Sequence, residues 1–436
     1  MGPIVDTVES RTQPPQSADV VIIGGGIIGV SAALDLAEQG VSTVLCEKGV
    51  IAGEQSSRNW GWCRRMGRDP RELPLIVESM KLWETMDRRI GKDVGFRRGG
   101  ILYLCETQAD VGRREEWIRS AGNFALDTKI VAGNELQALL PGAAHHFKAA
   151  LYTASDGRAE PQKAAPAIAR AASRAGASIV TACAVLGIET AAGRVSGVVT
   201  ERGRIDCSTV VIAGGVWSSR LCRNLGLRLP QLAVRASVLR TAPVSGVPEA
   251  AAWAPGFAFR KRLDGGYTVA NGSANLYDIV PDSFRYFPDF LPALKLEWAH
   301  VELRMGRAFL RNPLGPQKAG FERIRVLDPA PMDRQLKAAR AALERSFPAF
   351  KGVPTVQTWA GLIDAVPDMI PVISNVERMP GLFIATGFSG HGFGIGPGAG
   401  RLVADLVRGV NPVVDPTPFR YERFVDGTRP QPLTGV

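Results

Sequence analysis

The chain has 436 residues, of which 45% are apolar, and its lysines and arginines exceed its aspartates and glutamates by 10. This length allows two domains, and the longest apolar run falls short of the roughly 18 residues that a membrane-spanning helix needs. The basic residues are dispersed, which gives nucleic acid binding no specific support. The net charge can attract anionic substrates or an acidic membrane surface, and the alternative, which we favour, is ordinary surface charge.

Residues 1–17 lack both a basic start and an apolar core, so we interpret them as a flexible arm and not as a signal peptide. The six cysteines form no C-x-x-C pair, which argues against zinc, iron–sulfur clusters and a disulfide framework. We therefore expect no metal site and a reducing, cytoplasmic location.

The stretch ADVVIIGGGIIGVSAALDLAEQGVSTVLCEKG, which starts at Ala18, has the pattern of a nucleotide-binding strand, turn, helix and strand. Its glycines Gly24, Gly26 and Gly29 have G-x-G-x-x-G spacing, which allows a tight turn, close approach of a pyrophosphate and close packing of the helix on the strand. The second strand ends at Glu47, where a carboxylate can accept hydrogen bonds from both ribose hydroxyls. An acidic residue there favours FAD or NAD over NADP.

Further along the chain, apolar spacing predicts helices over 74–89, 108–120, 161–175 and 335–347. Strands are expected at 97–105, 177–188, 194–201 and 204–212, and the β runs between 231 and 310 suit an antiparallel sheet. Residues 381–409 predict a short strand, a glycine-dense turn and a helix from about 398 to 407. This last segment lacks the G-x-G-x-x-G spacing, so we find no internal repeat.

These pieces, in this order, resemble the FAD-dependent D-amino acid oxidase superfamily, the group that contains sarcosine oxidase, glycine oxidase and D-amino acid dehydrogenases. The motifs that carry the resemblance are the glycine stretch above, SSRNWGW, VVIAGGVWS, WAGLIDAVPDMIPVI and GFSGHGFG. The resemblance implies an α/β fold, with a Rossmann-like FAD-binding domain built from discontinuous segments and an α+β substrate domain with a mainly antiparallel sheet. On this plan the FAD-binding domain comprises 18–85, 158–228 and 354–410, the substrate domain comprises 86–157 and 229–353, and 411–436 form a C-terminal tail.

The resemblance also implies which residues contact FAD. Gly24, Gly26, Ile28 and Gly29 would meet the pyrophosphate, Glu47 the ribose, and Lys48 and Val185 the adenine; Ser56, Ser57, Asn59, Gly61 and Trp62 would follow the ribityl chain; Ala213 and Gly214 would lie beside the cofactor; and Gly361, Gly390, His391, Gly392, Phe393 and Gly394 would border the isoalloxazine.

Two departures from the sarcosine oxidase pattern affect the site. Sarcosine oxidases attach flavin through a cysteine in the loop before the PD dipeptide, whereas this chain has Ala360 and Gly361 there, so we expect non-covalent FAD. They also place a lysine directly after GHGF to hold the substrate carboxylate, whereas this chain has Gly394. The anchor for the carboxylate, and with it the substrate, therefore stays open.

Oxidation of a C–N bond by hydride transfer to flavin N5 leaves negative charge on the ring, which a helix N-terminus can stabilise. The turn before the last helix is placed for this purpose, and we interpret His391 as part of that turn first and as a proton acceptor second. Arg64 aligns by spacing with the arginine that sarcosine oxidase uses for its substrate carboxylate. Arg260 and Tyr267 are second candidates. The structural alternatives are surface pairing for Arg64 and simple burial for Tyr267.

We therefore predict an FAD-dependent enzyme that oxidises an amino acid or related amine to an imine, which hydrolyses to the oxo acid. The alternatives are an FAD-dependent 2-hydroxy-acid dehydrogenase and a flavin-carrying subunit of a heteromeric amino-acid dehydrogenase. The electron acceptor is oxygen or a quinone-type carrier. Thr268 falls near the position of the lysine that sarcosine oxidase uses toward oxygen, and its lack of charge favours the quinone-type carrier.

Overall fold

The apolar, β-branched runs form a six-stranded sheet in the computed structural model, which describes residues 2–272, 275–297, 301–305, 320–429 and 431–433. The strand order is β21-β22-β13-β1-β2-β9, and all neighbours are parallel except β21 and β22. Runs such as VVII are continuously apolar because both faces of a parallel sheet are buried. The strands are β1 (Val20–Ile23), β2 (Thr43–Cys46), β9 (Ser178–Val180), β13 (Thr209–Ile212), β21 (Val372–Asn375) and β22 (Leu382–Thr386).

Four helices share a hydrophobic core with one face of this sheet: α1 (Ile27–Glu38), α3 (Leu73–Ile90), α6 (Pro161–Arg174) and α12 (Gly392–Arg408). The helices α1 and α12 approach closely because of Gly400, where an added Cβ would lie 2.4 Å from the Ser31 Cβ. The helix α12 begins earlier than predicted, since its glycine-rich first turns are buried against α1 and α3 and not left as a loop.

The other face of the six-stranded sheet is covered by α7 (Ser218–Asn224) and by an antiparallel sheet of β10 (Val185–Ala191), β11 (Arg194–Thr200) and β12 (Gly203–Asp206). The strands predicted at 177–188 and 204–212 are therefore each two strands. The first half of 177–188 joins the six-stranded sheet as β9, and its second half forms β10 of the three-stranded sheet. In 204–212 the order is reversed, since β12 belongs to the three-stranded sheet and β13 to the six-stranded one.

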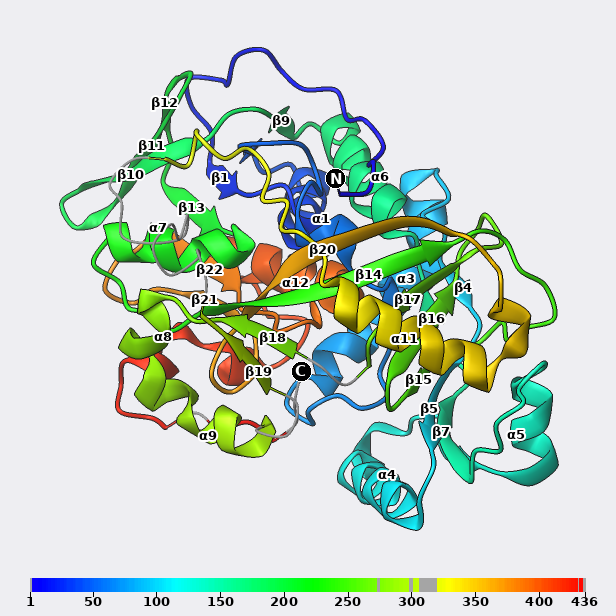
Figure 1. The fold of residues 1–436 in the computed structure, drawn as a ribbon. Coiled ribbons are helices and arrows are strands. Elements are labelled where there is room, and N and C mark those ends of the chain that lie inside the picture. Colours follow the sequence, from blue (N-terminus) through cyan, green and yellow to red (C-terminus); the bar gives the residue numbers. More distant parts are fainter. Residues whose placement is uncertain (1, 273–274, 298–300, 306–319, 430, 434–436) are drawn as a thin grey trace.

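A larger, mostly antiparallel sheet has the order β19-β18-β14-β17-β16-β15-β5-β7-β6, with β20 paired along β14. Figure 1 shows β14 and β20 as long ribbons that cross the middle of the molecule, with α11 (Asp333–Ser346) beside them. The strands are β5 (Ile101–Cys105), β6 (Thr128–Val131), β7 (Ala149–Thr153), β14 (Leu232–Thr241), β15 (Ala251–Ala254), β16 (Phe257–Lys261), β17 (Tyr267–Ala270), β18 (Asn275–Asp278), β19 (Val301–Arg304) and β20 (Thr355–Ala365). The predicted fold class is confirmed.

The remaining elements are short or peripheral. They are α2 (Gln55–Arg58), α4 (Gln108–Ser120), α5 (Gly133–Leu139), α8 (Pro281–Arg285), α9 (Phe287–Glu297) and a small sheet of β3 (Trp62–Cys63), β8 (Gly157–Arg158) and β4 (Arg97–Arg98). The arm before β1 lies against the body, since Asp6 N donates to Gln162 O and Arg11 N to Ile179 O. The division into domains stays a prediction; β20, from the segment 354–410, pairs with β14 from the segment 229–353.

Candidate active site

The turn between β1 and α1 is built around glycines that no larger residue could replace. Gly24 has φ +116°, and a Cβ there would lie 2.4 Å from the Ala213 carbonyl oxygen. A Cβ on Gly29 would lie 2.0 Å from the Gly24 carbonyl oxygen. The first amide of α1, Ile27 N, donates to Ser56 Oγ at 2.9 Å, so α2 is tied to the positive end of the helix.

Glu47 lies at the carboxyl end of β2 beside this turn. Its carboxylate accepts hydrogen bonds from Gly25 N and Gly49 N, both at 2.7 Å. Burial raises the pKa of Glu47, and these two amide bonds oppose that rise. The next residue, Lys48, turns away to Glu54, which it contacts at 2.8 Å.

A groove of about 160 Å³ runs from this turn to the start of α12. It collects residues from β1, β2, α2, β10, β20 and the loops after β13 and β22. The predicted cofactor residues that line it are Gly24, Gly26, Ile28, Glu47, Lys48, Ser56, Asn59, Val185, Ala213, Gly214, Gly390, Gly392 and Phe393.

Other predicted cofactor residues are not among those that line the groove: Gly29, Ser57, Gly61, Trp62, Gly361, His391 and Gly394. Several have packing roles that explain their position. A Cβ on Gly361 would lie 2.1 Å from Gln55 Oε1, and the Gly394 carbonyl accepts hydrogen bonds from Ser79 Oγ at 2.7 Å and Trp83 Nε1 at 2.9 Å. These residues shape the wall and do not line the space.

Asp364 is a residue of this site that the sequence reasoning missed. It is the last residue but one of β20. Its Oδ2 accepts hydrogen bonds from Gly387 N at 2.7 Å and Thr386 Oγ1 at 3.1 Å, while its own carbonyl accepts from Ser389 N at 3.0 Å. Burial raises the pKa of Asp364, and the hydrogen bond from Gly387 opposes the rise. One side chain thus holds the turn that leads into α12. The only signal for its role in the sequence is that an acidic residue stands in a predicted motif that precedes, along the chain, the glycine-dense turn.

His391 is buried directly before α12, and its Nδ1 lies 3.1 Å from Glu72 Oε2. Burial is the main cause that lowers the pKa of His391 to about 4, with Arg68 adding to this effect and Glu72 opposing it. At neutral pH the imidazole is therefore uncharged. Its backbone N donates to Phe388 O at 2.7 Å, so the residue is part of the turn before α12, and a role as proton acceptor stays a prediction.

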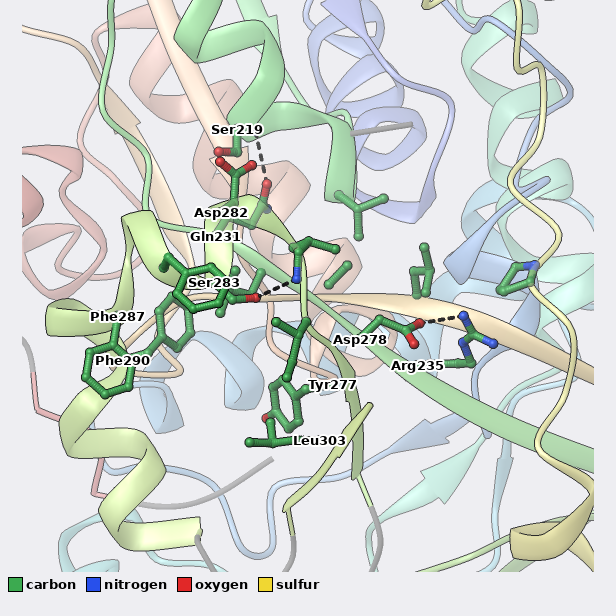
Figure 2. Close-up of a pocket in the computed structure, with 18 of the residues that line it drawn as sticks. Ser219, Gln231, Arg235, Tyr277, Asp278, Asp282, Ser283, Phe287, Phe290 and Leu303 are labelled. Carbon is green, nitrogen blue, oxygen red and sulfur yellow. Dashed lines mark hydrogen bonds and ion pairs between the residues drawn. The ribbon is translucent and has the colours of Figure 1, made fainter. Parts of the chain in front are cut away.

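A second cavity, of about 450 Å³, adjoins the groove at two residues that line both spaces, Val216 and Leu362. Most of its wall is apolar and comes from β14, β18, α8 and α9. Figure 2 shows Phe287 and Phe290 on one side of this cavity and the Arg235–Asp278 pair on the other. Residues between 277 and 284 contribute much of the wall, and 298–300 and 306–310 lie outside the described residues.

The three side chains predicted to anchor the substrate do not line either space. Arg260 is 1% exposed and pairs with Glu160 at 2.8 Å, and Tyr267 donates its hydroxyl to Pro248 O at 2.7 Å in a closed core. Contrary to expectation, both are therefore packing residues. Arg64 donates to Met66 O and stacks on the Tyr103 ring, 5.4 Å from its centroid. The nearby acids Asp69 and Glu72 are buried and pair instead with Arg71 and His391.

The groove has the features that an adenine dinucleotide with a flavin ring requires. Its glycine cradle leaves the N-terminus of α1 open to an anionic group, and the Glu47 carboxylate at the end of β2 lines the same groove, which is the arrangement that a pyrophosphate and a ribose would need. Gln55 Oε1 lines the groove, is buried and has no hydrogen-bond partner among the described residues, so a polar ligand group would satisfy it.

Comparison with known proteins also indicates a flavin-binding protein. The family model for FAD dependent oxidoreductases matches residues 19–406. The structure of L-amino acid deaminase from Proteus myxofaciens in complex with anthranilate is 36% identical, with a TM-score of 0.91 over 97% of this chain and 96% of that one. Glycine oxidase from Pseudomonas aeruginosa is 25% identical over 92% of this chain and 98% of its own length. Sarcosine oxidase subunit beta from Arthrobacter sp is 26% identical over 96% and 94%.

Proposed function

The chain belongs to the FAD-dependent oxidoreductase family and is an FAD-dependent amino acid or amine oxidoreductase, and within that class we propose that it oxidises the C–N bond of L-amino acids with apolar side chains. The product is an imino acid, which water converts to the 2-oxo acid and ammonia. The observation that carries the proposal is the largely apolar cavity that meets the groove at Val216 and Leu362. The likeness to the Proteus enzyme supports the L configuration.

FAD, when bound, supplies the two-electron acceptor for this oxidation. The chain's own residues position and shield the reaction. Asp364 holds the turn before α12, so the helix N-terminus faces the groove and favours negative charge there. Leu362 and Val216 add apolar surface where the cavity meets the groove, which keeps water from the reacting carbon. No cysteine occurs after Cys222, so we propose non-covalent FAD, which acid precipitation should release into the supernatant.

The experiment is anaerobic mixing of the purified protein with L- and D-leucine, L- and D-phenylalanine, sarcosine and L-lactate. Bleaching of the flavin band near ~450 nm reports reduction, and trapping of the 2-oxo acid reports the product. We expect the L-amino acids to bleach the flavin fastest. If none of them does so, the proposed function is wrong.

The two alternatives from the sequence make different predictions. A 2-hydroxy-acid dehydrogenase needs a firm base for the hydroxyl, yet among the described residues that line the cavity there is no histidine, and each aspartate pairs with an arginine. A flavin-carrying subunit is suggested by the sarcosine oxidase subunit beta. Turnover by the isolated chain would exclude it.

The electron acceptor and the location stay proposals. We propose that a quinone-type carrier accepts the electrons, because Thr268 and not a lysine lies on β17. We also propose that the protein is cytoplasmic. Among the described residues, no helix is both long enough and apolar enough to cross a bilayer. Steady-state assays with oxygen and with a soluble quinone, at equal substrate concentration, separate the two acceptors.

A further inference from the structure

The cavity contains two arginines among its lining residues, Arg220 and Arg235. Arg235 lies on β14 in direct register with Leu362 on β20, the residue that borders both the cavity and the groove. Arg235 therefore lies next to the residue at which the cavity and the groove meet. A ligand that spans this junction would meet its side chain.

Arg235 is held in place but incompletely neutralised. Its Nη2 lies 2.5 Å from Asp278 Oδ2, and the other oxygen of Asp278 accepts from Arg304 Nε at 2.7 Å. One carboxylate thus faces two guanidinium groups. The Nη1 of Arg235 reaches only Ala330 O at 3.4 Å, and its buried Nε has no partner among the described residues.

No other described carboxylate of the cavity wall is available to balance this charge, because each has an arginine of its own. The pairs are Asp282 with Arg223 and Arg285, and Asp328 with Arg58. The side chain of Arg235 is 14% exposed, so solvent screens its charge only weakly. An anionic group entering the cavity would gain both a charge partner and spare N–H donors.

Resting on the proposed function, we propose that Arg235 binds the α-carboxylate of the amino-acid substrate, with Asp278 orienting its guanidinium. Phe287 and Phe290 lie on the opposite side of the cavity (Figure 2), so a substrate held by Arg235 would direct its apolar side chain toward them. Its α-carbon would then lie near Leu362, at the opening to the groove. Arg235 would thus take over, from a different part of the chain, the role that a lysine at the position of Gly394 has in sarcosine oxidases.

The test compares wild type with R235Q, using anthranilate as an unreactive carboxylate and aniline as the same ring without one. Binding is followed through the change in flavin absorbance. We expect R235Q to bind anthranilate about 10- to 100-fold more weakly, since it loses a charge-assisted hydrogen bond, and to bind aniline as wild type does. Equal affinity of R235Q and wild type for anthranilate would overturn the proposal.

R304Q is the matched control, because Arg304 contacts the same aspartate but does not line the cavity. We expect its affinity for anthranilate to stay within about threefold of wild type. R235K keeps the positive charge but not the two parallel N–H donors of arginine, so its affinity for anthranilate should lie between those of wild type and R235Q. The content of bound FAD and the Tm show which variants are folded. If amino acids never reduce the wild-type flavin but R235Q still loses affinity for anthranilate, the proposed reaction is wrong, while Arg235 is still a carboxylate-binding residue.

Discussion

At Gly29 a side chain has no room, because an added Cβ would lie 2.0 Å from the Gly24 carbonyl oxygen, a backbone atom that cannot rotate away. Gly24 itself is held at φ +116° against Ala213. The missing side chains let three backbone segments meet at the N-terminus of α1. The predicted role of these glycines thus has a physical basis at the level of single atoms, although the bound cofactor contacts stay predictions.

G29A should purify largely without flavin, because the forced shift of the turn costs about 1–3 kcal/mol and displaces the amides that face the groove. The ratio of absorbance at ~450 nm to that at 280 nm measures this. G112A is the control: Gly112 lies in α4 with nothing within 4 Å of its added Cβ, so it should keep full flavin content. Flavin-replete G29A would contradict the assignment.

The pH dependence of stability tests the state of His391. Its pKa of about 4 in the fold lies below the usual 6.5, so as pH falls the unfolded chain takes up this proton first and the fold loses stability between pH 6.5 and 4. H391N keeps a donor for Glu72 but cannot titrate. Between pH 7 and 5, wild type should lose about 2 kcal/mol more unfolding free energy than H391N, measured by urea denaturation. Equal losses would mean that His391 is already charged in the fold.

At the scale of elements, the site depends on how β20, β22 and α12 meet. The strand β20 crosses from the larger sheet to the groove, and Asp364 at its end ties the turn 386–389 in place. The orientation of the α12 N-terminus therefore depends on a strand of the other sheet. Substrate cavity and cofactor groove share this strand, since Leu362 borders both.

D364A should weaken FAD binding and lower stability by about 1–3 kcal/mol, because it leaves the buried Gly387 amide unpaired, whereas the Thr386 hydroxyl can still donate to Gly215 O. D364N keeps one acceptor oxygen and should recover part of both losses. Titration of apoprotein with FAD, with thermal unfolding alongside, gives the two readouts. Unchanged FAD affinity in D364A would show that the turn is held by other contacts.

At the scale of the whole molecule, a buried ion pair connects segments that the sequence assigned to different domains. Glu160 precedes α6, and Arg260 lies on β16 of the larger sheet, with Nη1 2.8 Å from Glu160 Oε1 and Nη2 3.0 Å from Glu160 Oε2. A two-point contact between nearly unexposed groups fixes the geometry of both partners. The arginine expected to bind substrate therefore joins the two parts of the fold.

R260M should lower stability by about 3 kcal/mol, because it removes the two-point partner of the buried Glu160 and leaves only Arg262, at 3.8 Å. The double variant E160M/R260M should recover much of that loss. In the remaining folded protein, the rate of flavin reduction by L-leucine should match wild type, measured by anaerobic stopped flow. A stable R260M that has lost substrate affinity would restore Arg260 as the anchor.

The sequence by itself determined the nucleotide-binding unit, because glycine spacing and continuous apolar runs act through local backbone geometry. Its resemblance to a known family added the fold class, the use of FAD and the class of enzyme. It also predicted α4 and α6 closely, since their periodicity is local. Only the tertiary structure decided which arginines are fully neutralised by a carboxylate and which are not. Arg260 is neutralised by Glu160, while Arg235 and Leu362 become neighbours through the pairing of β14 with β20. Ion-pair partners and cavity walls arise from long-range packing, which no short stretch of sequence encodes.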